Sequence, residues 1–442
     1  MEKKCFNHQN QAPLPSGGVG GGFFDKIVER RGTNCVKWDA KFPFGIDDSE
    51  REKLIPLWVA DMDFEVAPAI REALQKRVEH GVFGYTTVQN SYYEAVVRWF
   101  ERRHNWLIQR EWIQYTTGVV PAVSAVIKAL TMPGERVLIL TPVYNCFFSN
   151  IRNNGCEVVE SKLKPTPNPS PREGNIDVSK NTLTNLSPLP SGGDGGGYTY
   201  EINWSDFERK CADEKTTVFL LCNPHNPAGR VWTHEELQRM NDICLRHGVR
   251  IVSDEIHCEL VMPGHRFTPF GTVNTATDAT APVICGSPSK SFNIAGLQMA
   301  HIICADPEAR RRIDRAININ EICDVNPFAP LAVEAAYNEG EAWLDALNEY
   351  LWGNYQALCE FFAENLPQLK VFQLEGTYLV WVDIAATGLS GDEFEEKLLR
   401  EAQVWVNSGT MYGTDGFIRI NLATQRSRLM EGLRRIAAVF NP

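Results

Sequence analysis

The residues with the clearest chemical potential form a polar loop, Ser287 to Leu297, which reads SPSKSFNIAGL and follows an apolar run. A lysine amine can condense with an aldehyde, and hydroxyl groups beside it can bind a phosphate. This combination suits pyridoxal 5′-phosphate (PLP), with Lys290 as the amine and Ser287 and Ser289 as phosphate ligands. Considered alone, the loop is weak evidence for such a site and fits an ordinary surface lysine better.

Two polar residues follow other apolar runs upstream of this loop. Asp254 follows Ile251–Ser253, and Asn226 lies in the turn sequence NPHNPAG after Val218–Cys222. A buried carboxylate can pair with a protonated pyridine nitrogen and keep the ring an electron sink, and an asparagine amide can donate to the ring oxygen. Taken singly, Asp254 also fits a helix cap and Asn226 a plain turn.

Two further segments could contact a phosphate and a ring. Thr117 to Ala122, which reads TGVVPA, is predicted to begin a helix, and the first backbone amides of a helix attract a phosphate. Tyr144 follows the apolar run Val137–Leu140, where its ring could stack on a pyridine. Helix capping and simple packing explain these segments as well.

Short apolar runs alternate with helical patterns, as in a mainly parallel sheet covered by helices. The expected fold class is therefore α/β, and open α/β sheets bind ligands beyond the carboxyl ends of their strands. The runs 137–140, 218–222, 251–253, 283–285, 379–382 and 417–421 are predicted strands, and 92–104, 122–130 and 235–247 are predicted helices.

The pattern changes after about Phe328, which predicts three parts: an N-terminal segment contributing to a small domain (1–80), a large PLP-binding domain (81–327) and a smaller C-terminal domain (328–442). Two Gly- and Pro-rich segments, 12–23 and about 164–197, have little apolar surface to offset the entropy of ordering. We expect both to be flexible insertions without a catalytic role.

Composition excludes several classes of protein. The 442 residues are 43% hydrophobic and carry a net charge of −11, which argues against a nucleic-acid partner. No apolar run is long enough to cross a membrane, and the polar N-terminus reads as no signal peptide, so we expect a cytoplasmic protein. The twelve cysteines lack metal-ligand spacing, so no metal site is predicted and most should be buried thiols.

The order and spacing of these pieces resemble the fold-type I PLP enzymes of the aminotransferase class I/II family, over nearly the whole chain. The segments LWVADMDF (57–64), FGYT (83–86), NPHNPAG, SDEIH and PSKSFNIAGLQ are similar to the branch of cystathionine β-lyases and related C–S lyases. The resemblance implies a large domain with a mainly parallel seven-stranded sheet and a smaller α/β C-terminal domain.

The resemblance also implies roles for individual residues. Lys290 would hold PLP as a Schiff base and Asp254 would bind the ring nitrogen; Arg419, in FIRINLA, would bind the substrate carboxylate. Asn226 and His257 would lie near the ring oxygen, with Asn226 also near the substrate. Tyr144 would stack on the cofactor and take part in catalysis. The phosphate would be bound by Val119, Val120, Ser287 and Ser289.

Tyr85 would reach the cofactor phosphate and the substrate in a neighbouring subunit, which implies a homodimer with shared sites. Many aminotransferases carry a phosphate-binding arginine eight residues after the lysine, whereas this chain has Gln298. That difference favours the lyase branch, where other residues are tolerated at this position.

The activity implied is α,β-elimination of cystathionine or a related cysteine thioether, giving a thiol, pyruvate and ammonia. An aminotransferase that uses an L-amino acid and a 2-oxo acid is the alternative enzyme. A regulatory binding protein is the alternative from another class. The sequence names neither the preferred amino acid nor the pathway.

Overall fold

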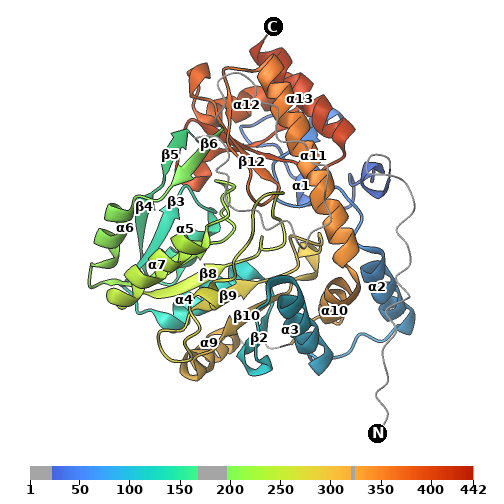
Figure 1. The fold of residues 1–442 in the computed structure, drawn as a ribbon. Coiled ribbons are helices and arrows are strands. Elements are labelled where there is room, and N and C mark those ends of the chain that lie inside the picture. The colour runs from blue at the N-terminus through green and yellow to red at the C-terminus, as the bar shows by residue number, and fades with distance from the viewer. Residues whose placement is uncertain (1–21, 168–196, 320–323, 442) are drawn as a thin grey trace.

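A sheet of seven strands forms the centre of the larger region of this computed structural model (Figure 1). The structure describes residues 22–167, 197–319 and 324–441. The strand order is β2-β10-β9-β8-β7-β3-β4. Strand β10 is antiparallel to both of its neighbours, and the remaining pairs are parallel. The strands are β2 (Ile113–Thr116), β3 (Arg136–Thr141), β4 (Glu157–Lys162), β7 (Thr216–Cys222), β8 (Arg250–Asp254), β9 (Val283–Gly286) and β10 (Ala300–Cys304).

Helices cover both faces of this sheet because successive side chains of each strand point to opposite faces. On β3, Val137 and Ile139 pack with α4, α5 and α9, whereas Leu138 and Leu140 belong to the core on the other face. That second core also contains side chains of α2, α3, α6, α7, α8 and α10. The helices are α2 (Pro68–His80), α3 (Asn90–His104), α4 (Val119–Leu130), α5 (Cys146–Asn153), α6 (Trp204–Cys211), α7 (His234–Arg246), α8 (Phe270–Val273), α9 (Pro307–Asn318) and α10 (Ala329–Glu339).

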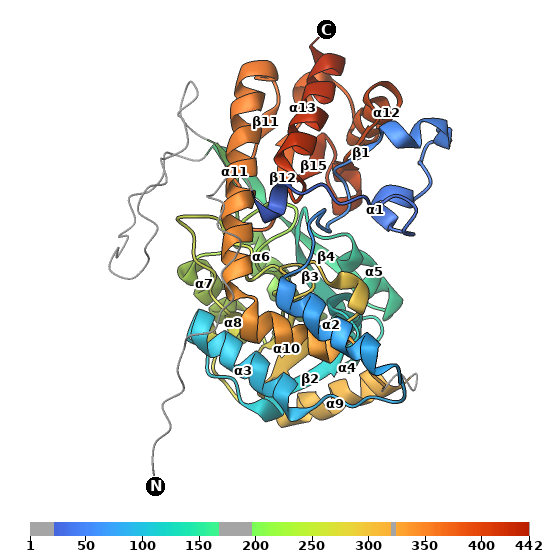
Figure 2. The same cartoon turned by 90° about the vertical axis from the view of Figure 1, so that its right-hand side faces the viewer.

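A second sheet, of order β11-β12-β15-β14, lies near the C-terminal end of the chain with α11, α12 and α13 beside it (Figure 2). Its strands are antiparallel. The N-terminal segment joins this part, because β1 pairs in parallel with β13. The elements are α1 (Val36–Asp39), β1 (Ile55–Pro56), α11 (Glu341–Asn365), β11 (Lys370–Val371), β12 (Leu379–Asp383), α12 (Gly391–Ala402), β13 (Val404–Trp405), β14 (Asn407–Ser408), β15 (Phe417–Asn421) and α13 (Arg426–Phe440).

The predicted fold class and all six predicted strands are confirmed, and the three predicted helices are found with ends shifted by up to three residues. The predicted domain division stays a prediction. Both the N-terminal segment and residues after 328 do contribute to the smaller sheet region. However, α10 lies after 328 and packs against α2 and α3 at the large sheet (Figure 2).

The expectation of a structureless insertion over about 164–197 is wrong at its start. Residues Lys164–Pro167 form β5, which pairs with β6 (Tyr198–Glu201) in an antiparallel ladder that aligns Pro167 with Tyr198. Backbone hydrogen bonding along this ladder orders a segment whose composition resembles a loop. Residues 168–196, and most of the segment 12–23, lie outside the described residues.

Most of the described cysteines are buried free thiols, as predicted: seven of ten are buried. Three consecutive arginines lie on α9, where Arg311 and Arg312 are exposed while Arg310 donates to the carbonyl of Cys304 at 2.8 Å. Across residues 22–167, 197–319 and 324–441, no helix is long and apolar enough to cross a membrane.

Candidate active site

The candidate site lies at one edge of the central sheet, where neighbouring parallel strands end. Strands β3, β7, β8 and β9 run in the same direction and lie side by side. Asp254 is the last residue of β8, and Tyr144, Asn226 and Lys290 lie in the loops that follow β3, β7 and β9. The carboxyl ends of parallel strands share one edge of the sheet, so the fold brings these four residues to the same edge although they span 147 residues of the sequence.

Lys290 is held by a backbone carbonyl from the N-terminal segment. Its Nζ donates to the carbonyl of Ala60, which also accepts the Tyr378 hydroxyl at 2.9 Å. Burial lowers the pKa of Lys290 to about 8, with Asp61 opposing the shift and Arg419 adding to it. A lysine amine with this pKa has a substantial neutral fraction near neutral pH and can act as a nucleophile or a base.

Asp254 is a buried carboxyl group close to Lys290. Burial raises its pKa to about 7, opposed by the N–H of Ile256, which donates to Oδ1 at 3.1 Å, and by the charge of Lys290. Since desolvation penalises the ionised carboxylate, a cation bound against Asp254 would restore its charge. The site therefore favours a positively charged partner at this position.

His257 is 3% exposed, and its Nδ1 has no hydrogen-bond partner among the described residues. Burial lowers its pKa to about 3, helped by the charges of Lys290 and Arg419. The imidazole is therefore neutral near pH 7 and offers either a donor or an acceptor to a bound group. Its ring packs edge to face against Tyr378, with the ring centroids 6.1 Å apart.

Arg419 reaches the site from β15 of the smaller sheet. Nη1 donates to the side-chain oxygen of Asn226 at 3.2 Å, and Nη2 donates to the carbonyl of Trp58 at 2.8 Å. The guanidinium carbon also lies 4.9 Å from the centroid of the Tyr412 ring. Nε is buried without a hydrogen-bond partner among the described residues, so one N–H of this guanidinium is available to an anion.

The remaining predicted cofactor ligands lie at the start of α4 and in the loop that follows β9. Gly118 is the N-cap of α4, and the amides of Val119 and Val120 are first-turn donors without an intrahelical acceptor. Ser287 donates its hydroxyl to the carbonyl of Met299 at 2.7 Å and accepts the amide of Ser289 at 3.1 Å. In this arrangement Ser287 orders the lysine loop, and the Ser289 hydroxyl and the α4 amides are the groups that could hold a phosphate.

Burial raises the pKa of Tyr144 well above its ordinary value, and the nearby charge of Asp254 adds to this shift while Arg419 opposes it. Tyr144 therefore remains protonated beside the other site residues. Tyr85 does not join them within one chain: it lies after α2 and is 97% exposed.

Several residues of the site were not predicted from the sequence. Trp58 and Ala60 contribute backbone carbonyls, and Tyr378 donates its hydroxyl to the carbonyl of Ala60. Asp61 and Cys146 act on the charge of Lys290. The segment 57–64 had been recognised only as part of a family motif. A backbone carbonyl has no side-chain signature, so its role is visible only in three dimensions.

A trio of possible metal ligands, His104, Cys258 and Glu259, lies at the end of α3 and in the segment that follows β8. Glu259 pairs with His104 at 2.6 Å, accepts the indole N–H of Trp99 at 2.6 Å and pairs with Arg103 at 3.3 Å. Both carboxylate oxygens are therefore engaged by protein donors, and the trio is explained as a buried hydrogen-bond network.

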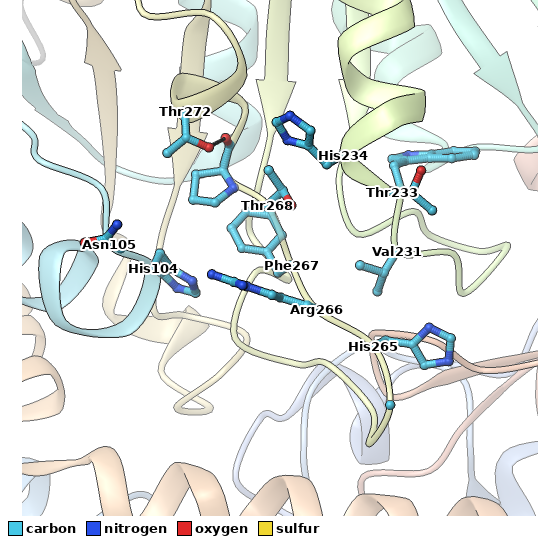
Figure 3. Close-up of a pocket in the computed structure, with 13 residues that line it drawn as sticks. His104, Asn105, Val231, Thr233, His234, His265, Arg266, Phe267, Thr268 and Thr272 are labelled. Carbon is cyan, nitrogen blue, oxygen red and sulfur yellow. Dashed lines mark hydrogen bonds between the residues drawn. The ribbon is translucent and has the colours of Figure 1, made fainter. Parts of the chain in front are cut away.

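The structure also contains a pocket of about 520 Å³, whose lining residues are drawn in Figure 3. Its lining includes His104, His234, His265 and Arg266 but none of the predicted site residues. We therefore assign the active site from the chemistry at the sheet edge rather than from the size of a cavity.

Comparison with known proteins identifies the family to which this chain is similar. The sequence model of "Aminotransferase class I and II" matches residues 52–436. "Cystathionine beta-lyase PatB" of Bacillus subtilis is 38% identical over 421 residues, covering 95% of this chain and all of that protein.

Two solved structures share the fold over nearly the whole chain. Cystalysin from Treponema denticola, which contains a pyridoxal 5′-phosphate cofactor, has a TM-score of 0.81 and 33% identity, covering 94% of this chain and 98% of its own. A PLP-bound putative aminotransferase from Clostridium difficile has a TM-score of 0.82 and 38% identity, covering 95% of this chain and 99% of its own. The protein belongs to the aminotransferase class I and II family.

Proposed function

We propose that this protein is a PLP-dependent C–S β-lyase that eliminates a thiol from cystathionine or a related L-cysteine thioether, leaving pyruvate and ammonia. The observation that carries this proposal is the convergence of the Lys290 amine, the buried Asp254 carboxyl and the partly unpaired Arg419 guanidinium at one sheet edge. The relative named cystathionine β-lyase and the structural neighbour cystalysin support the reaction class.

The donor set fits PLP group by group. Among the described residues, no charge near Asp254 is strong enough to keep its pKa low, which suits a protonated ring nitrogen. The unpaired Nδ1 of His257 and the side-chain N–H groups of Asn226, whose oxygen is occupied by Arg419, can serve the ring oxygen. First-turn amides at Val119 and Val120 suit the phosphate.

When bound, PLP supplies an aldehyde that captures the substrate amine and a protonated ring that takes up electrons from the α-carbon. Arg419 binds the substrate carboxylate and fixes which α-substituent faces the lysine. Lys290 Nζ, once free, accepts the α-proton, and its lowered pKa makes the neutral base available. Tyr144, held protonated by burial, would pack against the cofactor ring.

We also propose a cytoplasmic homodimer with shared active sites. Val82, Phe83 and Tyr85 are large side chains that are all more than half exposed on one short segment, as expected of a surface covered by a second copy. Co-expression of Lys290→Ala with Tyr85→Ala subunits tests the arrangement. Shared sites predict that mixed dimers regain one intact site and therefore activity. Independent sites predict that mixed dimers are no more active than the two variants measured separately.

Pyruvate release from L-cystathionine, measured with the PLP-loaded protein and no 2-oxo acid, tests the reaction. The proposal predicts pyruvate and ammonia in equal amounts, with Lys290→Ala as the inactive control. Absence of pyruvate, together with amino transfer once a 2-oxo acid is added, would instead identify an aminotransferase.

A further inference from the structure

The Lys290 amine is held by a segment without regular secondary structure, residues 57–64, which follows β1. The carbonyl of Ala60 in this segment accepts the hydrogen bond from Lys290 Nζ. Backbone groups outside helices and strands need partners other than the regular ladder of hydrogen bonds. The position of the Ala60 carbonyl therefore depends on the side chains that bind this segment.

Asn421, a buried residue on β15, binds the segment on both sides of Ala60. Its amide nitrogen donates to the carbonyl of Val59 and, at 2.7 Å, to that of Asp61. Its oxygen accepts the N–H of Ala423 at 2.7 Å, so the amide cannot turn without losing this third bond. Because each peptide group is planar, fixing the two flanking carbonyls leaves the Ala60 carbonyl between them little freedom to turn.

Asn293 binds the same segment from the lysine loop. Its amide nitrogen donates to the carbonyls of Met62 at 3.0 Å and Phe64 at 2.9 Å, and its oxygen accepts the N–H of Met62 at 3.0 Å. Its φ of 57° is a left-handed conformation that asparagine adopts more readily than most residues. Asn293 lies three residues after Lys290, so one loop carries both the amine and a side chain that holds its acceptor.

We propose that Asn293 and Asn421 are positioning residues for proton transfer by Lys290. By fixing the Ala60 carbonyl, they keep an N–H of the neutral lysine amine directed at that carbonyl, which leaves the lone pair to face the substrate. The α-proton then moves to Nζ, and the electron pair of the broken C–H bond stays with the α-carbon. The same carbonyl stabilises the ammonium group that results.

Asn354 provides a matched control for the loss of a buried asparagine. Its amide nitrogen also donates to two backbone carbonyls, those of Leu422 and Thr424, each at 2.9 Å. Its oxygen accepts a hydrogen bond from Nε of Arg426 at 2.6 Å. None of these groups belongs to the segment 57–64, so Asn354→Ala should lower stability about as much as Asn421→Ala without displacing the Ala60 carbonyl.

The first test labels the cofactor-free protein with acetic anhydride over a range of pH and follows acetylation of Lys290 by peptide mass spectrometry. A carbonyl held against Nζ favours the protonated amine, so loosening it should lower the midpoint of the labelling curve. We expect a shift of at least about half a pH unit in Asn421→Ala and in Asn293→Gly, because hydrogen bonds to charged groups are the stronger ones. Asn354→Ala should keep the wild-type midpoint.

The design of the variants isolates the effect of the carbonyl. Glycine at position 293 retains the left-handed backbone without strain, and no variant adds a charge. Arg30 continues to bind the Asp61 carboxylate at 2.7 Å. The groups that act electrostatically with Lys290 are all retained: Asp61, Cys146, Asp254, His257 and Arg419.

The second test measures exchange of the α-proton of L-alanine in D2O by NMR, with the PLP-loaded protein and saturating L-alanine. L-alanine carries no leaving group on its β-carbon, so exchange reports proton transfer without elimination. Exchange should slow about 10- to 100-fold in Asn421→Ala and Asn293→Gly, as expected for a misplaced base. Asn354→Ala should exchange at the wild-type rate.

Wild-type midpoints or wild-type exchange rates, in whichever of Asn421→Ala and Asn293→Gly folds, would overturn the proposal. Equal effects of Asn421→Ala and Asn354→Ala would also overturn it, because they would show a structural role alone.

The inference rests on the proposed function only in giving Lys290 the role of base. Shifted midpoints without pyruvate release from L-cystathionine would retain the positioning roles and reject the lyase. Pyruvate release with unshifted midpoints would retain the lyase and reject the positioning roles.

Discussion

Arg419 and Asn226, 193 positions apart in the chain, are joined by a hydrogen bond of 3.2 Å from Nη1 to the asparagine oxygen. The bond connects β15 of the smaller sheet to the loop after β7 of the central sheet. Because the oxygen of Asn226 accepts this bond, the group of Asn226 that could bind the proposed cofactor is its amide nitrogen. The residue proposed to bind the substrate thus also orients a residue proposed to bind the cofactor.

Arg419→Ala should raise KM for the amino-acid substrate about 10- to 100-fold, the range expected for losing a charge-assisted contact. Because Arg419 also orients Asn226, a smaller fall in kcat should accompany the change. Steady-state kinetics measure both constants. Arg400→Ala, on the exposed surface of α12, is the matched control and should change neither. An unchanged KM in Arg419→Ala would remove this residue from the substrate site.

Lys290→Ala should abolish turnover while the protein remains folded, because the change removes the base and the covalent anchor but little core packing. Borohydride reduction of the PLP-loaded protein followed by peptide mass spectrometry should locate the cofactor on Lys290. The exposed Lys128→Ala, on α4, should retain both activity and labelling at Lys290. Turnover at the wild-type rate by Lys290→Ala would refute the assignment.

Asp254→Asn should change how the stability of the cofactor-free protein depends on pH. The pKa of Asp254 is raised from 3.8 to about 7, so its contribution is present below pH 3.8 and is lost as pH rises through 7. Relative to wild type, the free energy of unfolding of the variant should therefore increase between pH 5 and pH 8, as measured in urea.

Glu255→Gln is the control, because burial raises the pKa of this neighbouring carboxyl to about 8. It should shift stability in the same direction, but only Asp254→Asn should also weaken PLP binding. Equal PLP affinity of Asp254→Asn and wild type would contradict the proposed pairing with the ring nitrogen.

Asp63→Asn should destabilise the protein by about 3 kcal/mol, because it leaves buried cations without their charge partner. Asp63 is 1% exposed and contacts Arg30 at 2.8 Å and Lys37 at 3.0 Å. Burial alone would raise the pKa of Asp63, but the neighbouring charges, with Lys37 first among them, lower it to about 2. The contribution of Asp63 to stability is therefore present above pH 3.8 and is lost as pH falls through 2.

Urea unfolding at pH 7 measures this loss. Glu401→Gln, which removes an exposed pair with Lys397, should change stability by only about 0.5 kcal/mol or less. A comparably small change for Asp63→Asn would show that the buried network contributes little.

Deleting residues 169–196, so that Asn168 is followed by Gly197, should leave activity intact. Pro167 is paired with Tyr198 in the β5–β6 ladder, and Asn-Gly is a favoured two-residue connection between antiparallel strands. Circular dichroism and pyruvate release check folding and activity. A deletion that extends through β5 and β6 is the contrasting variant, and it should unfold or lose stability because it removes the ladder. Loss of activity in the shorter deletion would assign the segment a functional role.

The sequence alone predicted the α/β class, six strands of the two sheets and the residues that follow them. Strand side chains alternate between two buried faces, so Val137–Leu140 and Ile251–Ser253 read as apolar runs, and the polar residues after them mark strand ends. These signals are local, which is why Asp254, Asn226 and Lys290 could be chosen. The β5 strand was missed because its pairing with β6 spans residues far apart in the chain.

Only the tertiary structure decided how these residues are held. The carbonyl of Ala60 joins Lys290 to Tyr378, and the carbonyl of Trp58 binds Arg419, although backbone atoms give no signal in a sequence. Local sequence patterns identified the strands and the polar side chains that follow them. Long-range packing and desolvation determined which of these side chains lie together and what charge each one holds.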